Sequence, residues 1–389
     1  MVDTWGKRFT VLFAGGGTGG HLMPGLTVAA ELKRCFPESR QVFVGSTKAI
    51  ERSMVERHGF EFHALPSAKR PSSPLGAPAW TARMVGGLLG ARKLIHKIQP
   101  NVVVSLGCYA AFAPSLAARL AGVPLVIMEQ NAYPGKTNRL LSWWADEVYA
   151  PWRGTEAYFA YPDRVQVTGN PVRGDLRRVH NRRLANEFGL SPRKKTLLVM
   201  GGSQGARFIN QTMAKALDRL EREAVSWLQV LHSTGEADLE ETRAAYERSG
   251  MQATVLPFIE DMSTAYAVAS LAVCRAGGTT LAELTTQGVP AILIPLPIAA
   301  NDHQRRNAAR LAGLGAAVLV DQSDLTAARL ADAVLNVLRN DRLISGMRNA
   351  SIKIGCPEAA RNVVSRLCGV LQNGSRQAEP LVAPFVEGG

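Results

Sequence analysis

The stretch Phe9-Thr-Val-Leu-Phe-Ala-Gly-Gly-Gly-Thr-Gly-Gly-His21 decides the fold, because its pattern returns once in the chain. The second copy reads Thr196-Leu-Leu-Val-Met-Gly-Gly-Ser-Gln-Gly-Ala-Arg207. In each copy an apolar strand leads into a glycine-rich turn and then a helix-like run, which is typical of a parallel sheet. The repeat therefore predicts an α/β protein with two Rossmann-like, doubly wound domains. Ligands would bind where the strands end, in a cleft between the domains.

Further apolar runs mark the remaining strands of both halves. The expected strands are residues 10–14, 41–45, 102–106, 125–128, 147–150, 196–200, 228–232, 253–256, 271–274, 291–295 and 317–320. Gly169-Asn-Pro-Val-Arg173 is typical of a linker. We expect an N-terminal domain over residues 1–170 and a C-terminal domain over 171–355. A helix over 356–376 should return to the N-terminal domain, and 377–389 should be a disordered tail.

Composition narrows the class of protein. The chain has 389 residues, of which 46% are hydrophobic, so each half can bury a core. Five scattered cysteines without a C-x-x-C pair argue against a disulfide framework or a zinc site. We expect no signal peptide. Residues 98–118 carry no charge, but Pro100 and Pro114 interrupt them, which favours a buried strand over a membrane span.

Charge indicates an anionic partner. The formal net charge is +13, and no acidic residue occurs between Glu61 and Glu129. Sparse aromatic residues and the lack of a recognition motif argue against nucleic acid. Residues 80–98 read as an amphipathic helix with two open interpretations: a surface helix packed on the sheet, or a basic face that docks on a membrane. Its apolar positions are Trp80, Met84, Leu88, Ala91, Ile95 and Ile98, and its basic positions are Arg83, Arg92, Lys93 and Lys97.

The first glycine-rich turn, residues 15–20, contains G-x-G-x-x-G and could bring backbone amides close to a phosphate at a helix N-terminus. A nicotinamide cofactor would also need an acidic residue after the second strand, where this chain has Gly45-Ser46-Thr47. The dehydrogenase interpretation therefore loses its main support. His21 follows the glycines, and a neutral imidazole there could accept a proton from a sugar hydroxyl.

The second half offers three loops with polar character. Residues 201–206 and 274–283 would aim amides at an anion, and Glu283 could hold a ribose diol. The amide-rich segment 301–307 suits sugar hydroxyls, which need both donors and acceptors. The chain contains no D-x-D, so a metal-clamped site is not indicated and no cofactor is expected. Helix termini and amides would then stabilise the leaving group.

Six motifs in this order resemble the MurG family of peptidoglycan glycosyltransferases over about residues 8–370. They span residues 16–21, 129–131, 169–173, 201–207, 275–283 and 303–307. The resemblance implies a GT-B fold and an inverting, metal-independent transfer of GlcNAc from UDP-GlcNAc. The acceptor would be the C4 hydroxyl of undecaprenyl-diphospho-MurNAc-pentapeptide, and the product lipid II. It also implies a peripheral location on the cytoplasmic face of the cell membrane, with cell-wall synthesis proteins as partners.

The resemblance also implies roles for individual residues. His21 is the first candidate for the catalytic base and Glu129 the second. The implied acceptor-binding residues are Thr18, Gly19, Gly20, Tyr109 and Asn131. The implied donor-binding residues are Arg173, Ser203, Gln204, Ile259, Gly277, Thr280, Glu283, Gln304 and Asn307. The chain departs from the family pattern at Cys108, Met128, Ala276 and Ile298.

Two alternatives remain open at this point. One is another GT-B enzyme, such as a UDP-GlcNAc 2-epimerase or a glycolipid transferase. The other is a non-catalytic scaffold that binds a nucleotide sugar. Turnover of labelled UDP-GlcNAc with and without the lipid-linked acceptor would separate them.

Overall fold

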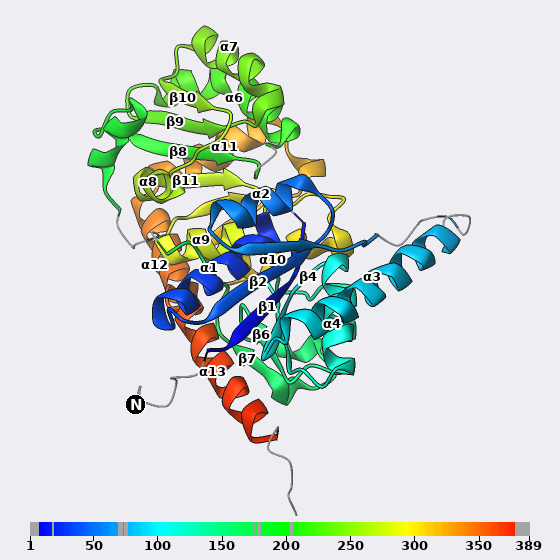
Figure 1. Cartoon of the computed structure of the whole chain (residues 1–389). Coiled ribbons are helices and arrows are strands. Elements are labelled where there is room, and N and C mark those ends of the chain that lie inside the picture. The colour runs from blue at the N-terminus through cyan, green and yellow to red at the C-terminus, as the bar shows by residue number, and fades with distance from the viewer. Residues whose placement is uncertain are drawn as a thin grey trace, which may run out of the picture.

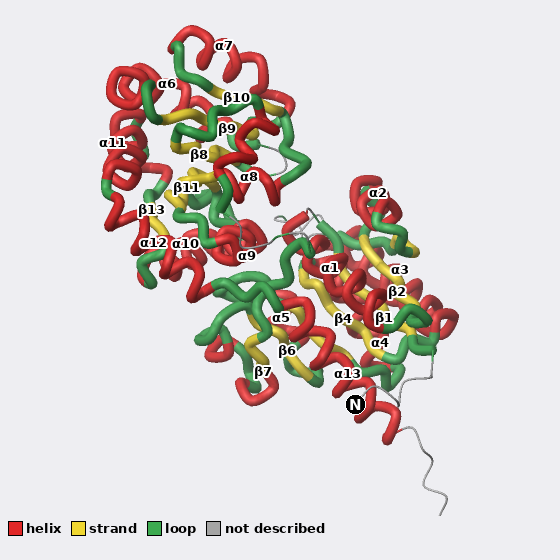
Figure 2. Tube along the Cα trace, turned by 90° about the vertical axis from the view of Figure 1, so that its left-hand side faces the viewer, coloured by secondary structure: helices red, strands yellow, loops and turns green. Residues whose placement is uncertain are grey.

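The computed structural model describes residues 8–17, 19–68, 73, 77–174, 176, 180–202 and 205–377, without the side chains of 373–377. The chain forms two lobes, each built around one sheet (Figures 1 and 2). Thr18, Ser203 and Gln204, for which site roles were predicted, lie outside the described residues. The predicted tail over 377–389 also lies outside them, except for Gln377, which ends the last helix and not a tail.

The N-terminal sheet has, within the described residues, seven parallel strands in the order β3-β2-β1-β4-β5-β6-β7. Their bounds are β1 Thr10–Gly15, β2 Arg40–Gly45, β3 Glu61–Ala64, β4 Val102–Gly107, β5 Leu125–Met128, β6 Glu147–Ala150 and β7 Val165–Val167. The C-terminal sheet has six parallel strands in the described part of the chain, in the order β10-β9-β8-β11-β12-β13. Their bounds are β8 Lys195–Met200, β9 Leu228–Ser233, β10 Ala253–Leu256, β11 Ala269–Cys274, β12 Ala291–Leu293 and β13 Ala317–Leu319.

Helices cover both faces of each sheet. In the N-terminal domain they are α1 Gly19–Cys35, α2 Ala49–Arg57, α3 Ala77–Ile98, α4 Phe112–Leu120 and α5 Lys136–Leu141. Those that follow are α6 Arg207–Ala224, α7 Leu239–Ser249, α8 Met262–Val268, α9 Gly278–Gln287, α10 His303–Gly313, α11 Ala327–Arg339, α12 Asp341–Ile354 and α13 Ala359–Gln377. Short 3-10 turns are η2 Tyr109–Ala111, η3 Glu156–Tyr158, η4 Pro162–Arg164, η5 Arg182–Phe188, η6 Glu236–Asp238, η7 Ala300–Asp302 and η8 Gln322–Asp324.

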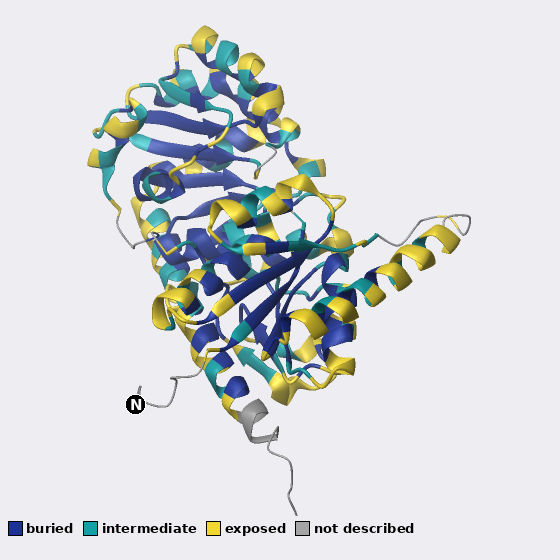
Figure 3. Ribbon diagram, viewed as in Figure 1, coloured by how far each residue is buried: buried dark blue, intermediate teal, exposed yellow. Residues whose placement is uncertain are grey.

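The two-residue period of the strands divides each core into two layers. On β1, Val11 and Phe13 pack with α1, α2 and α13, whereas Leu12 and Ala14 pack with α3, α4 and α5. On β8, Leu197 and Val199 face α6 and α11, and Leu198 faces α8, α9 and α10. The strands are therefore buried on both faces (Figure 3), as their continuous apolar runs predict.

These observations confirm the predicted fold of two Rossmann-like parallel-sheet domains. Two strands were missed, β3 and β7, and they are the two edges of the N-terminal sheet. Neither is a buried apolar run: the pattern of β3 begins with exposed Glu61, and β7 is not fully buried at any residue. Short, half-polar edge strands give a weak sequence signal.

The last helix returns to the first domain. Val363, Val364 and Leu367 of α13 pack in the same cluster as the core residues of β1 and α1. Arg366 forms an ion pair with Glu147 at the start of β6. The two domains also share packing after β6, because Trp152 lies in the core cluster of the C-terminal domain.

The helix α3, which includes residues 80–98, differs in burial along its length. Ala91, Ile95 and Ile98 are buried against the sheet, so this part of the apolar stripe is structural. Val85 and Leu89 are 52% and 58% exposed, and the N-terminal half of α3 projects from the domain (Figure 1). Within the described residues, no helix is long and apolar enough to cross a membrane.

Candidate functional site

The predicted site residues gather where strands end at their carboxyl edges. In the N-terminal domain they follow β1, β4 and β5, and in the C-terminal domain they follow β10, β11 and β12. The order of strands reverses between β1 and β4, and again between β8 and β11. Such switch points are where open α/β sheets bind ligands. We call the region where these loops of the two domains touch the domain junction.

His21 lies in the first turns of α1 and is half-buried. Its Nδ1 is 2.8 Å from Oε1 of Gln130. The amide of Gln130 has a fixed orientation, because its Nε2 donates to the carbonyls of Met128 (3.0 Å) and Leu106 (3.3 Å). Its oxygen must therefore accept from His21, which places the proton of the neutral ring on Nδ1. The basic lone pair is then on Nε2.

Glu129 is 3% exposed, and both of its carboxylate oxygens are used to hold its own loop. Oε1 accepts hydrogen bonds from the amides of Gln130 and Asn131 and from the side chain of Asn131, at 2.9–3.0 Å. Oε2 accepts from the amide of Gly135 and from Nδ2 of Asn138. Protonation would disrupt this set, since a carboxylic acid replaces one acceptor with a donor. The geometry gives Glu129 an organising role.

Asn131 and Asn307 join the two domains. Nδ2 of Asn307 donates to Oδ1 of Asn131 (3.1 Å) and to the carbonyl of Ala276 (3.1 Å). Oδ1 of Asn307 accepts from the amide of Ala132 at 2.8 Å. Asn307 is fully buried, and its side chain is hydrogen-bonded to these three partners; the donor contact expected for it stays a prediction. The side chain of half-buried Asn131 donates to Glu129 and accepts from Asn307, and its predicted contact with the acceptor stays a prediction.

The start of α9 completes the domain junction. Gly277 precedes the helix, and Gly278 lies so close to Gln130 that a Cβ there would be 2.2 Å from its carbonyl oxygen. The hydroxyl of Thr279 donates to the carbonyl of Gly20 at 2.9 Å. Thr280 follows on the same turn. The amide end of α9 therefore lies against the turn that carries Gly19, Gly20 and His21.

Glu283 is buried on α9, with 6% exposed. Its Oε2 accepts a hydrogen bond from the hydroxyl of Tyr266 at 2.9 Å, and its Oε1 is 3.4 Å from Nε of Arg173. Burial and the neighbouring carboxylate raise the pKa of Tyr266 well above its usual value, so the hydroxyl stays a donor. Ile259, which is predicted to contact the uracil of the donor, is buried between β10 and α8.

Gln304 connects the loops after β11 and β12. Its Oε1 accepts from the amides of Leu296 (3.0 Å) and Ala276 (3.3 Å), which leaves its side-chain NH₂ without a partner among the described residues. Arg275 donates to the carbonyls of Ile294 and Pro295, both at 3.1 Å. These contacts hold the loop after β11 against the loop after β12.

Tyr109 and the residues at which the chain departs from the family pattern lie around the domain junction. Tyr109 opens η2 directly after β4 and is half-buried. The preceding Cys108 has φ +59°, a region that favours the glycine expected there, and its Sγ accepts from the amide of Gly16 at 3.3 Å. Burial raises the pKa of the Cys108 thiol. The backbone carbonyls of Met128 and Ala276 accept hydrogen bonds from Gln130 and Asn307. The side chain of Ile298 is 87% exposed.

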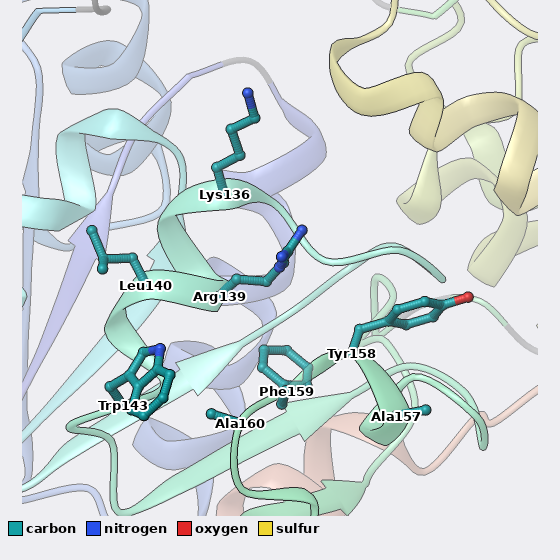
Figure 4. A pocket seen from close by; sticks show the side chains of 8 residues that line it. All are labelled: Lys136, Arg139, Leu140, Trp143, Ala157, Tyr158, Phe159 and Ala160. Atoms are coloured by element: carbon teal, nitrogen blue, oxygen red, sulfur yellow. The ribbon is translucent and has the colours of Figure 1, made fainter.

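A pocket of about 560 Å³ lies elsewhere, on the α5 side of the N-terminal domain. Figure 4 shows Lys136 and Arg139 extending from α5 on one side, with the rings of Trp143, Tyr158 and Phe159 around the rest. The guanidinium of Arg139 also donates to the hydroxyl of Tyr133. No predicted site residue lines this pocket, so it is separate from the domain junction.

Sequence reasoning missed three residues that organise the site: Gln130, Tyr266 and Glu51. Gln130 lies between Glu129 and Asn131, and the roles predicted for these two neighbours were the sequence signal that could have identified it. Tyr266 reads as an ordinary helical residue, because only the fold brings it to Glu283. Glu51 lies on α2, and only the fold brings it to Gly17, 34 positions earlier in the chain.

The comparisons with known proteins agree with the geometry. Residues 11–150 match the glycosyltransferase family 28 N-terminal domain, and residues 196–363 match the family 28 C-terminal domain. A Pelobacter propionicus protein is 38% identical over 92% of this chain and 98% of its own length. A Geobacter sulfurreducens protein is 37% identical over 92% and 97%. Both are named UDP-N-acetylglucosamine--N-acetylmuramyl-(pentapeptide) pyrophosphoryl-undecaprenol N-acetylglucosamine transferase.

The crystal structure of Acinetobacter baumannii MurG superimposes with a TM-score of 0.74 at 30% identity, covering 93% of this chain and all of that one. The chain belongs to the MurG family. It is therefore a glycosyltransferase with the GT-B fold, which decides against the scaffold interpretation. A putative UDP-N-acetylglucosamine 2-epimerase from Listeria monocytogenes has a TM-score of 0.68 at 15% identity, covering 98% of this chain and all of that one, and shares the fold alone.

Proposed function

We propose that this enzyme transfers GlcNAc from UDP-GlcNAc to the C4 hydroxyl of undecaprenyl-diphospho-MurNAc-pentapeptide and so forms lipid II for peptidoglycan. The shared name of relatives that match nearly the whole chain carries this proposal. The arrangement at the domain junction supports it, because a candidate base on one domain lies beside the anion-binding end of a helix on the other.

In the proposed mechanism, the C4 hydroxyl attacks the anomeric carbon of GlcNAc as Nε2 of His21 removes its proton. The bond to the leaving UDP oxygen breaks with its electron pair, and the configuration at the anomeric carbon inverts to β. Gln130 keeps the His21 proton on Nδ1, so Nε2 is free to act as the base. Glu129 is the weaker candidate, because both its oxygens are occupied.

The donor would lie on the C-terminal domain. We assign the diphosphate to Arg173 and to the amides at Gly277 and Thr280, where the N-terminus of α9 favours negative charge. We assign the ribose to Glu283, the uracil to the backbone of Ile259 and the GlcNAc hydroxyls to the NH₂ of Gln304. No step of this scheme uses a metal or a cofactor.

A turnover assay with labelled UDP-GlcNAc tests the reaction. We expect labelled sugar to enter the lipid fraction only when the muramoyl-pentapeptide lipid is present. Release of UDP without acceptor would instead point to an epimerase, and binding without turnover would contradict the transferase altogether.

Glu283→Ala should weaken UDP binding. The substitution removes the proposed ribose acceptor and the anion that orients Arg173. Loss of a hydrogen bond to a charged group costs about 1.5–3 kcal/mol, so the dissociation constant for UDP should rise by about one to two orders of magnitude. Isothermal titration with UDP measures this change. The exposed Glu241 on α7 supplies the control Glu241→Ala, and equal UDP affinity in both variants would refute the ribose assignment.

We place the enzyme on the cytoplasmic face of the membrane, attached peripherally through α3. The basic side chains of α3 are all exposed, and Val85 and Leu89 are exposed among them. Leu141 of α5 and Phe159 pack in the same core layer as α3, and the exposed Trp143 lines the pocket beside them. Exposed aromatic rings and cations together suit the interface of an anionic bilayer.

Removing the basic side chains of α3 should release the enzyme from anionic vesicles. The variant replaces Arg83, Arg92, Lys93 and Lys97 with Gln. Each cation near an anionic surface contributes about 1 kcal/mol, so binding should fall steeply with both the substitutions and added salt. Transfer to a short, water-soluble acceptor should stay nearly intact. Co-sedimentation with vesicles across a salt series measures binding.

The matched control removes four exposed arginines of the C-terminal domain. These are Arg193, Arg222, Arg248 and Arg342. Net charge then falls equally in both variants, so a difference between them reports the position of the charges. Equal vesicle binding by the α3 variant and the parent would exclude α3 as the docking face.

A further inference from the structure

Glu51 is a buried carboxylate that forms no ion pair with any described residue. It lies in the first turn of α2 and is 1% exposed. Of the other buried acids, Asp238 and Glu283 face Arg207 and Arg173, whereas Glu129 is held, like Glu51, by hydrogen-bond donors. A carboxylate buried without a cation is strongly unfavourable unless several hydrogen-bond donors surround it.

The donors around Glu51 come from the ends of β1 and β2. Oε1 accepts from the amide of Gly17 at 2.6 Å and from the hydroxyl of Ser46 at 2.8 Å. Oε2 accepts from the amide of Ser46 at 2.7 Å. Converging amides of this kind form an anion site. The carboxylate therefore occupies the anion site at Gly17. The amide of Gly17 belongs to the glycine-rich turn that was predicted to bind a phosphate.

Two glycines leave room for this carboxylate, because they carry no side chain. A Cβ at Gly16 would lie 2.2 Å from Oε2 of Glu51, and one at Gly45 would lie 2.7 Å from the same atom. Any side chain at either position would displace the carboxylate. The glycine-rich turn and the turn after β2 are thus built to enclose Glu51.

The anchored turn leads directly to the candidate base. Gly17 has φ +108°, and a Cβ on it would lie 3.8 Å from Cδ2 of His21. Because Glu51 accepts a hydrogen bond from the amide of Gly17, it restrains a stretch of backbone close to the His21 ring. A displacement of about 1 Å in a reacting group can lower a rate by about 10²-fold.

We propose that Glu51 is a positioning residue for the transfer reaction: its carboxylate fills the anion site of the first glycine-rich turn and thereby holds His21 in place. Glu51 does not touch substrate in this role. The inference rests on the proposed function, because its kinetic consequence is a change in acceptor-dependent transfer.

Chemical rescue tests the proposal. Glu51→Ala should lower kcat by at least about tenfold and leave the KM for UDP-GlcNAc within about twofold, since the donor domain is untouched. Sodium formate, at constant ionic strength against chloride, should enter the vacated site, raise the melting temperature of the variant and restore part of its kcat. Neither effect should appear in the parent or in Glu56→Ala, a control at an exposed position of the same helix.

The outcomes separate the two proposals. A parent without acceptor-dependent transfer would refute the transferase, while stabilisation of Glu51→Ala by formate would still establish the anion site. Unchanged kcat in Glu51→Ala, or a loss that formate stabilises without restoring, would overturn the positioning role. If Glu51→Ala does not fold, Glu51→Gln keeps the shape without the charge. A parental kcat in Glu51→Gln would equally overturn the proposal.

Discussion

Replacement of His21 by alanine is expected to lower the turnover number of acceptor-dependent transfer by about 10²–10⁴-fold, the usual contribution of a positioned general base. The affinity for UDP should remain close to that of the parent, because His21 lies on α1 of the N-terminal domain, whereas we assign UDP to the C-terminal domain. The geometry supports the effect: Gln130 fixes the neutral tautomer, and the turn before α1 is anchored at Gly17. Single-turnover rates at saturating substrates measure it.

A matched control separates loss of the base from loss of any histidine. His58 is exposed at the end of α2, and its Nδ1 contacts only the carbonyl of Met54 among the described residues. His58→Ala should transfer GlcNAc at the parental rate. If His21→Ala stays within about threefold of the parent, the proton acceptor is another group.

The sequence predicts the fold because the fold depends on patterns that repeat along the chain. Apolar runs followed by glycine turns fix the inner strands, whose side chains are buried on both faces. The edge strands β3 and β7 lack that double burial and so lack the pattern. On α3 the apolar stripe predicts a packed face correctly at Ala91 and Ile95, but the projection of its first half depends on tertiary structure.

The site is only partly readable from sequence, because motifs indicate which loops meet but not which atoms pair. Asn131 and Asn307 were assigned to opposite substrates, yet their side chains bond to each other. Glu51 reads as a surface residue of a helix, and its contact with Gly17 spans 34 positions. Such pairings arise only when strands β1 and β2 lie side by side.

Asn307→Ala is expected to lower kcat/KM for transfer by about 10–10²-fold through loss of the link between the domains. The substitution removes one acceptor and two donors, and leaves the half-buried amide of Ala132 and the buried carbonyl of Ala276 without that partner. Each unsatisfied buried group costs about 1–3 kcal/mol. Loosening the contact between the 129–135 loop and the 275–278 loop should misalign acceptor and donor, even though neither proposed catalytic group is changed.

A double-mutant cycle with Asn131→Ala distinguishes a coupled link from two independent contacts. If the hydrogen bond between the two amides transmits the effect, the double variant should lose little more than Asn307→Ala alone, since residues in one network are not additive. The exposed Asn336 on α11 supplies the control Asn336→Ala, which should match the parent. Strict additivity of the two losses in kcat/KM would contradict the link. Parental kcat/KM in Asn307→Ala would show that the domains align without it, because then the 3.1 Å contact would carry no free energy that the reaction uses.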